Sequence, residues 1–348
     1  MIWYILLITL IFLFRLLFEK KLFCLSSGIL LWLLLALRSV TIGLNDTLNI
    51  YRPFFFQLDY RSFADLLNYK WFEFGFSLFS KILSFFIDDY QLYISILAIP
   101  FIYFTMRLIY NRSKFPLLSI IIFISLYYMY GTFLLRQVIA IGILTLAIDA
   151  IEDRKLLKFV ICIVIASFFH KSSLVFLIAY PFSNYMSFSK KNYIYILISY
   201  LFASFFGPFI LKNISYFDFT GKVEIGIEND IYSTDSGISM FGLVINTSII
   251  VFSDIFYKKA KDSKMNAYLN IATLGAMFYC FSKIVTEFYR ISMYFSFINI
   301  LMVPRALEKV EDNRFRFLIE LALTLVFIAY FLIRTINNVN ANPYSFCF

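Results

Sequence analysis

Charged residues are scarce in this 348-residue sequence, where Asp, Glu, Lys and Arg make up 15% of the residues and hydrophobic residues make up 61%. A typical soluble domain is about 25% charged, because its surface faces water on all sides. Long apolar runs recur from one end of the sequence to the other. The composition therefore excludes an ordinary soluble domain and predicts an all-α polytopic membrane protein.

Cysteine and histidine are rare as well, with four cysteines and one histidine. The cysteines lie mostly inside apolar runs, and no CxxC motif or metal-ligand spacing connects them. They are Cys24, Cys162, Cys280 and Cys347. We therefore expect neither a disulfide framework nor a zinc site. DxD and HExxH signatures are missing too, so we expect a protein that uses no metal and no cofactor.

Apolar runs of helical length predict about twelve transmembrane helices in one membrane domain, 1–348. They cover about 1–18, 25–37, 91–107, 115–131, 134–151, 156–170, 172–186, 192–211, 238–257, 265–282, 289–304 and 317–334. The first run lacks the basic leader of a signal peptide, so we expect it to be retained with its N-terminus outside. A shorter segment near 76–87 carries Lys81 and is expected to be an interfacial or re-entrant helix.

The basic residues predict the orientation of these helices, since short cytoplasmic loops are enriched in Lys and Arg. The formal net charge of +9 is spread over short loops, which indicates membrane orientation rather than nucleic-acid binding. If the segment near 76–87 does not cross, the basic turns alternate and both termini lie outside. Two long external loops then remain, at about 38–90 and 212–237, and both are rich in Tyr, Phe, Asn and Asp.

A few basic residues lie at the predicted external face, against the orientation rule. Arg136 and Gln137 begin one apolar helix from that side, His170 ends another just before Lys171, and Arg290 begins a third. An arginine at the bilayer centre is unfavourable by roughly 2.5–3.5 kcal/mol on insertion scales. We therefore expect these groups to line an outer-leaflet cavity in which an anion offsets the desolvation of Arg136.

These residue types suit a lipid-linked pyrophosphate as the anion. Guanidinium groups bind phosphate oxygens in bidentate fashion and stabilise charge on a departing pyrophosphate without a metal. Neutral His170, or a carboxylate such as Asp46 or Glu73, can accept the proton of a sugar hydroxyl. The alternatives are ordinary: Arg136 snorkels to headgroups, His170 is a polar helix end, Asp46 forms a turn and Glu73 is a surface carboxylate.

Six segments of the sequence together resemble the EpsG family of Wzy-type polysaccharide polymerases, and their order matches over essentially the whole chain. They are RSVTIGLNDTLNIY at 38–51, EFGF at 73–76, RQVIAIG at 136–142, SFFHKSSLVFL at 167–177, YRISMYF at 289–295 and NPY at 342–344. The GLND stretch departs from the family pattern, which more often has a shorter spacing between Gly and Asp. Because of this different spacing, the family pattern does not assign an exact role to Asp46.

The resemblance implies a metal-independent GT-C-like glycosyltransferase at the external face of the bacterial cytoplasmic (inner) membrane. Such an enzyme joins undecaprenyl-pyrophosphate-linked oligosaccharide repeat units of a capsule, exopolysaccharide or O-antigen and releases undecaprenyl pyrophosphate. The partners that the resemblance implies are membrane lipids, a flippase and a chain-length regulator. Catalytic roles are implied for Arg136, Arg290 and His170. Substrate-binding roles are implied for Arg38, Asp46, Tyr51, Glu73, Gln137, Lys171, Tyr289 and Tyr294.

Two other functions stay open at this point. An O-antigen ligase uses the same donor lipid but transfers the glycan to lipid A core or to a protein. A flippase moves the donor lipid across the membrane, exposes charged cavities to both sides and often shows internal repeats. The sequence has no such repeat, and its non-loop charges favour the external face, so the polymerase is the leading hypothesis.

A reporter fused to the C-terminus tests the orientation. We expect alkaline phosphatase to be active there and green fluorescent protein to be dark, because both termini are predicted to lie outside. The same reporters inserted after Lys191, in a predicted cytoplasmic turn, should give the reverse result. Fluorescence at the C-terminus would overturn the twelve-span orientation.

Overall fold

The computed structural model describes residues 2–42, 45–67, 69, 71–212, 236–257, 262–285, 288–336 and 344–347. Within these ranges the chain is helical and the only extended pairing is a single bridge between Arg38 and Phe346, so the all-α expectation is confirmed. The predicted loop 212–237 falls almost wholly outside the described residues. The chain divides into two compact units, Met1–Leu174 with Val310–Phe348 (unit 1) and Val175–Lys309 (unit 2).

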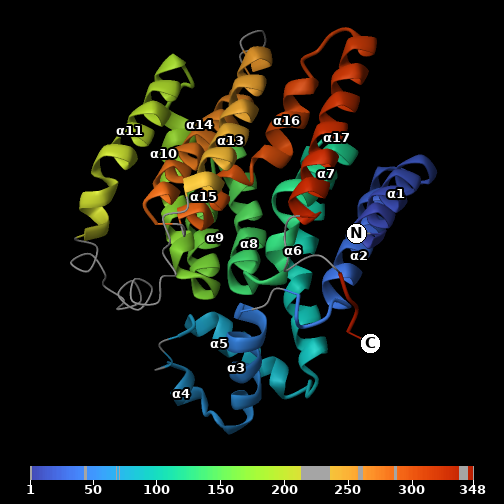
Figure 1. Ribbon diagram of the computed structural model, residues 1–348, viewed down its shortest axis with the longest axis vertical. Helices are drawn as coiled ribbons and strands as arrows, with labels where there is room; N and C mark the ends of the chain where they lie inside the picture. Colours follow the sequence, from blue (N-terminus) through green and yellow to red (C-terminus); the bar gives the residue numbers. More distant parts are fainter. Residues whose placement is uncertain are drawn as a thin grey trace. The chain divides into compact units, whose positions relative to one another are not determined.

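Unit 1 contains most of the helices drawn in blue, cyan and green in Figure 1, together with the last helix. Its α-helices are α1 (Ile2–Leu17), α2 (Lys20–Ala36), α3 (Arg52–Gln57), α4 (Phe63–Leu67), α5 (Phe74–Ser84), α6 (Tyr90–Arg112), α7 (Pro116–Leu126), α8 (Leu135–Glu152), α9 (Leu156–Phe169) and α17 (Asn313–Ile336). Short 3-10 or π-helical segments are η1 (Asn45–Tyr51), η2 (Leu58–Tyr60), η3 (Tyr128–Thr132) and η4 (Lys171–Ile178), which crosses the unit boundary.

Unit 2 is built around α14 (Ser263–Cys280), which packs against the other helices of the unit. These are α10 (Ala179–Tyr185), α11 (Lys190–Lys212), α13 (Ser236–Tyr257), α15 (Phe288–Ser296) and α16 (Asn299–Leu307), with the 3-10 turn η6 (Phe281–Lys283) after α14. Asn270 of α14 is fully buried, and its amide donates to the carbonyl of Met186 at 2.7 Å and accepts from Asn192 at 2.9 Å. This network fixes the turn before α11 onto α14.

The apolar runs predicted the positions of most helices, and three runs are broken where the sequence suggested continuous spans. The run 115–131 leaves the α-helical path after Leu126, 172–186 begins as the 3-10 turn η4, and 289–304 is divided between α15 and α16. By length and composition, α6 and α17 are able to cross a membrane. These apolar helices fit a membrane protein, whereas the number of twelve spans stays a prediction.

The segment expected near 76–87 is α5, which has 11 residues. At 1.5 Å per residue it is about 17 Å long, roughly half the thickness of a bilayer core. Lys81 lies on its inner face, where the side chain is buried and Nζ donates to the carbonyl of Leu58 at 2.5 Å. The length excludes α5 as a full crossing, and its interfacial placement stays a prediction.

Two glycines allow helices of unit 1 to approach closely. A Cβ on Gly142 of α8 would lie 3.0 Å from the carbonyl oxygen of Pro100 in α6, so the two backbones touch at this point. A Cβ on Gly75 of α5 would lie 2.5 Å from Cβ of Phe168 and 2.8 Å from its carbonyl oxygen. The second contact fastens the N-terminus of α5 to the C-terminal end of α9.

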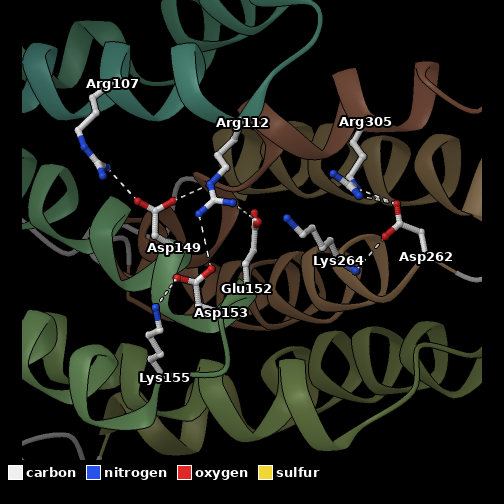
Figure 2. Close-up of polar contacts among 9 residues, drawn as sticks. All are labelled: Arg107, Arg112, Asp149, Glu152, Asp153, Lys155, Asp262, Lys264 and Arg305. Carbon is white, nitrogen blue, oxygen red and sulfur yellow. Dashed lines mark hydrogen bonds and ion pairs between the residues drawn. The ribbon is translucent and has the colours of Figure 1, made fainter.

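The C-terminal end of α8 holds a cluster of ion pairs, shown in Figure 2. Asp149 accepts from Arg107 at 2.9 Å and from Arg112 at 2.8 Å, and Arg112 also pairs with Glu152 at 2.9 Å. The side chains of Asp149 and Glu152 are almost fully buried. Both arginines belong to the basic turn at about 107–114, which the orientation rule predicts to be cytoplasmic, so buried carboxylates neutralise part of its charge.

A second cluster, also drawn in Figure 2, belongs to unit 2. Asp262 precedes α14, accepts the backbone N–H of Lys264 at 3.0 Å and pairs with Arg305 at 2.7 Å and Lys309 at 3.5 Å. Its carboxylate therefore caps α14 and neutralises two basic residues at the end of α16. These residues again come from turns that the sequence places on the cytoplasmic side.

Gly75→Ala should destabilise the protein because its methyl group meets the backbone of Phe168, which cannot move aside like a flexible side chain. We expect a loss of about 1–3 kcal/mol, visible as a lower unfolding temperature in detergent. Gly131→Ala is the matched control, because the nearest neighbours of its Cβ are side-chain atoms and no backbone: Cδ1 and Cδ2 of Leu35 at 2.9 and 3.4 Å, and Cδ1 of Phe101 at 3.5 Å. Equal unfolding temperatures for both variants would show that the contact between α5 and α9 is loose.

Candidate active site

Arg136 lies in the first turn of α8, at the end opposite Asp149. About 13 residues separate them, which is about 20 Å along a helix. Its guanidinium donates from Nη1 to Oε2 of Glu73 and from Nε to the hydroxyl of Tyr51 at 3.3 Å. The ring of Phe72 lies beneath it, with its centroid 4.6 Å from Cζ. The cation is thus held by a carboxylate, a phenol and an aromatic face.

One edge of this guanidinium is not used by the residues that the structure describes. Among the residues that the structure describes, none accepts a hydrogen bond from Nη2 of Arg136, and 19% of the side chain is exposed. Arginine presents its N–H groups in a planar fork that matches the spacing of phosphate oxygens. Arg136 can therefore bind a phosphate oxygen through Nη2 while it stays paired with Glu73.

Glu73 connects three elements through its two carboxylate oxygens. It precedes α5 with an extended backbone, φ −66° and ψ 145°. Oε2 accepts from Arg136, whereas Oε1 accepts the backbone N–H of Lys171 at 3.0 Å and lies 3.4 Å from Nδ1 of His170. Burial raises the pKa of Glu73, but the approach of His170, the charge of Arg136 and the Lys171 amide outweigh it and hold the pKa at about 2.

His170 follows the last residue of α9. Its backbone N–H closes that helix on the carbonyl of Ala166 at 3.0 Å, and its own carbonyl accepts from Ser173 at 3.0 Å. The backbone is extended there, φ −154° and ψ 107°, so the chain turns sharply out of the helix. The imidazole is 22% exposed and reaches Glu73 with Nδ1. An imidazole at this place can exchange a proton with a substrate hydroxyl near neutral pH.

Tyr51 ends the π-helical segment η1 and is almost fully buried. Its ring stacks on Phe72 at 5.4 Å with an interplanar angle of 10°. Burial raises the pKa of the Tyr51 phenol, and the nearby Arg136 only partly opposes this effect. The phenol therefore stays protonated and its oxygen accepts from Arg136. Asp46 lies in the first turn of the same segment, and its charge raises the pKa of Tyr51 further.

Three further candidates of unit 1 have different surroundings. Gln137 is buried beside Arg136, and Lys171 contributes its backbone N–H while its side chain is exposed. Arg38 is fully enclosed and donates to the carbonyls of Leu35 and Thr132, the latter at 3.2 Å. These contacts anchor the end of α2 next to η3, and a role of Arg38 toward a substrate stays a prediction.

The remaining candidates lie on α15 in unit 2. Arg290 is half-buried, and its Nε lies 3.4 Å from the hydroxyl of the adjacent Tyr289, whereas Tyr294 is buried. Arg136 belongs to unit 1 and Arg290 to unit 2, so the joint clamp of Arg290 and Arg136 stays a prediction. Within the described ranges, no group of three His, Cys, Asp or Glu side chains could hold a metal ion.

Sequence reasoning named Arg136, Glu73, His170 and Tyr51, and the structure brings these four together within unit 1. It missed Phe72, whose ring lies under Arg136, and Gly75, which lets α5 approach α9. The signal for both was present in the stretch WFEFGF, where an aromatic residue precedes the glutamate and a glycine follows two residues later.

Comparison with known proteins gives one match. The sequence profile described as the EpsG family matches residues 21–346, nearly the whole chain. No curated protein and no solved structure matches. The matched range contains every candidate residue discussed above.

Glu73→Gln tests the electrostatics of this cluster through stability. The folded pKa of Glu73, about 2, lies below its ordinary value of 4.5. Ionised Glu73 therefore stabilises the fold above pH 4.5, and this contribution is lost as the pH falls from 4.5 toward 2. We expect wild type to unfold at a higher temperature than the variant at pH 6, with the difference shrinking below pH 4.5.

The exposed Asp59, in the same loop, provides the matched control for this measurement. Asp59→Asn should follow the wild-type unfolding temperature over the same pH range, because an exposed carboxylate contributes little. A pH-independent difference between wild type and Glu73→Gln would contradict the ionic pairing of Glu73.

Proposed function

Because this chain belongs to the EpsG family of Wzy-type polysaccharide polymerases, we propose that it polymerises lipid-linked oligosaccharide repeat units. The donor is a growing glycan on undecaprenyl pyrophosphate, and the acceptor is the non-reducing end of the next lipid-linked unit. The reaction takes place at the external face of the bacterial cytoplasmic membrane. The product is a capsule, an exopolysaccharide or an O-antigen.

The observation that carries this proposal is the cluster of Arg136, Glu73 and His170, in which a phosphate-binding cation and a proton acceptor share one carboxylate. A glycosyl transfer from a pyrophosphate needs both groups. The leaving pyrophosphate gains negative charge, which a guanidinium stabilises, and the attacking hydroxyl loses a proton, which an imidazole accepts.

The reaction then proceeds in one displacement. The acceptor oxygen forms a bond to the anomeric carbon while the bond from that carbon to the pyrophosphate oxygen breaks. His170 takes the hydroxyl proton, and Arg136 donates a hydrogen bond from Nη2 to the departing phosphate. Attack from the face opposite the leaving group inverts the anomeric configuration. In this mechanism Arg290 is the second guanidinium on the pyrophosphate, with Arg38 in support.

The other candidates have roles in holding the sugars. Tyr289 and Tyr294 of α15, together with Asp46, Tyr51 and Gln137, offer the aromatic and hydrogen-bonding groups that a glycan site requires. We further propose a GT-C-type architecture for the membrane domain. A flippase that supplies the lipid-linked units and a chain-length regulator are the proposed protein partners.

The polymerase is tested with purified protein reconstituted in liposomes and supplied with the host's own lipid-linked repeat units. Alanine at Arg136, His170 or Arg290 should each reduce polymer formation by about 100-fold or more, the range reported for lost acid–base or charge-stabilising groups. Arg52→Ala is the matched control, because Arg52 is an exposed arginine of the same loop and its Cζ lies over the ring of Phe56 at 5.9 Å.

Wild-type polymer length in all three variants, at normal protein level, would refute this site. The same assay separates the alternatives. A ligase would transfer the glycan only when lipid A core or a protein acceptor is added. A flippase would move the lipid-linked unit between leaflets without forming polymer or releasing undecaprenyl pyrophosphate.

A further inference from the structure

Both carboxylate oxygens of Glu73 already contact protein groups, which is not expected of a residue that binds a sugar. Oε2 accepts from Arg136, and Oε1 accepts from the Lys171 amide and approaches Nδ1 of His170 at 3.4 Å. A carboxylate with both oxygens occupied in this way is a poor proton acceptor, since its partners stabilise the ionised form. The geometry therefore removes Glu73 from the candidates for the general base.

The position of Glu73 is also fixed by packing. Gly75, two residues along, brings α5 against the backbone of Phe168, two residues before His170. The amide of Lys171, immediately after His170, holds the same carboxylate oxygen that approaches the imidazole. Glu73 is thus fastened to the end of α9 from both sides of His170, and the approach to Nδ1 follows from this docking.

We propose that Glu73 is a positioning residue for His170: its carboxylate keeps the proton of the neutral imidazole on Nδ1, so that Nε2 is the nitrogen that accepts the proton of the acceptor hydroxyl. A histidine whose one nitrogen donates to a carboxylate presents the other as the acceptor. Once Nε2 has taken the proton, the ring is a cation next to the Glu73 anion. The catalytic part of this proposal rests on the proposed function, whereas the state of the ring does not.

Glu73 approaches the His170 ring directly, and three further charged or titratable groups of unit 1 are connected to it: Arg136 pairs with Glu73, Tyr51 binds Arg136, and Lys171 follows His170 in the chain. Glu73 comes from the start of α5, Arg136 from α8, Tyr51 from η1 and Lys171 from η4. Glu73 favours a protonated imidazole and Arg136 disfavours it. Replacement of Glu73 by glutamine removes the anion and leaves Arg136 uncompensated, so both changes disfavour the imidazolium. Replacement of Arg136 by glutamine acts in the opposite direction.

His170 is the only histidine in the sequence, so selective 15N labelling of histidine reports on a single ring. The protein is purified on a histidine-free tag, reconstituted in lipid and studied by solid-state NMR as the pH is changed. We expect the neutral wild-type ring to carry its proton on Nδ1. Glu73→Gln should shift the titration midpoint to lower pH by about one unit or more and raise the fraction protonated on Nε2.

Two further variants serve as controls for this test. Asp59→Asn should leave both the midpoint and the tautomer of the ring as in wild type. Arg136→Gln should move the midpoint to higher pH, and a general loosening of the fold cannot produce opposite shifts in Glu73→Gln and Arg136→Gln. A midpoint and tautomer that are identical in wild type and Glu73→Gln would overturn the proposal.

Kinetics on the reconstituted enzyme distinguish positioning from sugar binding. A positioning role predicts that Glu73→Gln lowers kcat about tenfold or more with little change in KM, and that the acidic limb of the pH–rate profile moves to lower pH. A sugar-binding role predicts a raised KM with an unchanged profile, and that result would overturn the catalytic part. Because the NMR experiment uses no sugar substrate, it stands even if the protein proves to be a ligase.

Discussion

The bridge that Glu73 forms between Arg136 and His170 connects the beginning of α8, the end of α9 and the beginning of α5. An arginine in the first turn of an otherwise apolar, buried helix needs a partner, because desolvation of an unpaired cation is costly. Glu73 supplies that partner from the segment 38–90, which is predicted to be external. The same carboxylate also contacts His170. The residue that neutralises Arg136 therefore also determines the surroundings of His170.

Helix α8 shows the same principle at its opposite end. Asp149 and Glu152 are buried there and paired with Arg107 and Arg112 of α6. Between Arg136 and Asp149 the helix carries no charged residue, and Gly142 lets it lie directly against the backbone of α6. The central helix of unit 1 is therefore an apolar rod with an ionic cluster at each end. That distribution suits a bilayer, in which charge is tolerated at the two interfaces and penalised between them.

The helices of this chain were largely predictable, because apolar runs of helical length are a strong local signal. The breaks after Leu126 and between α15 and α16 were not, since they lie beside contacts with residues distant in the sequence. Arg334 donates to the carbonyls of Ser125 and Leu126, and Ser292 of α15 donates to the carbonyl of Gly275. The sequence predicted which residues belong to the site, but it did not predict which of them contact one another. Glu73 was expected to face a sugar. In the structure it faces Arg136 and His170, because the close contact of Gly75 with Phe168 holds the start of α5 against the end of α9. Arg38 was expected at the substrate, whereas its present contacts are backbone carbonyls.

Under the proposed mechanism, one carboxylate also links the donor to the base. A pyrophosphate that binds Arg136 competes with Glu73 for the positive charge, because both are anions that accept from the same guanidinium. The more strongly the guanidinium is drawn to the phosphate, the less it offsets the charge of Glu73. The imidazole of His170 then experiences a more negative neighbour and becomes a stronger base. Arrival of the donor would thus raise the basicity of His170 at the moment when an acceptor hydroxyl must be deprotonated, and an enzyme without donor would keep a weaker base toward water.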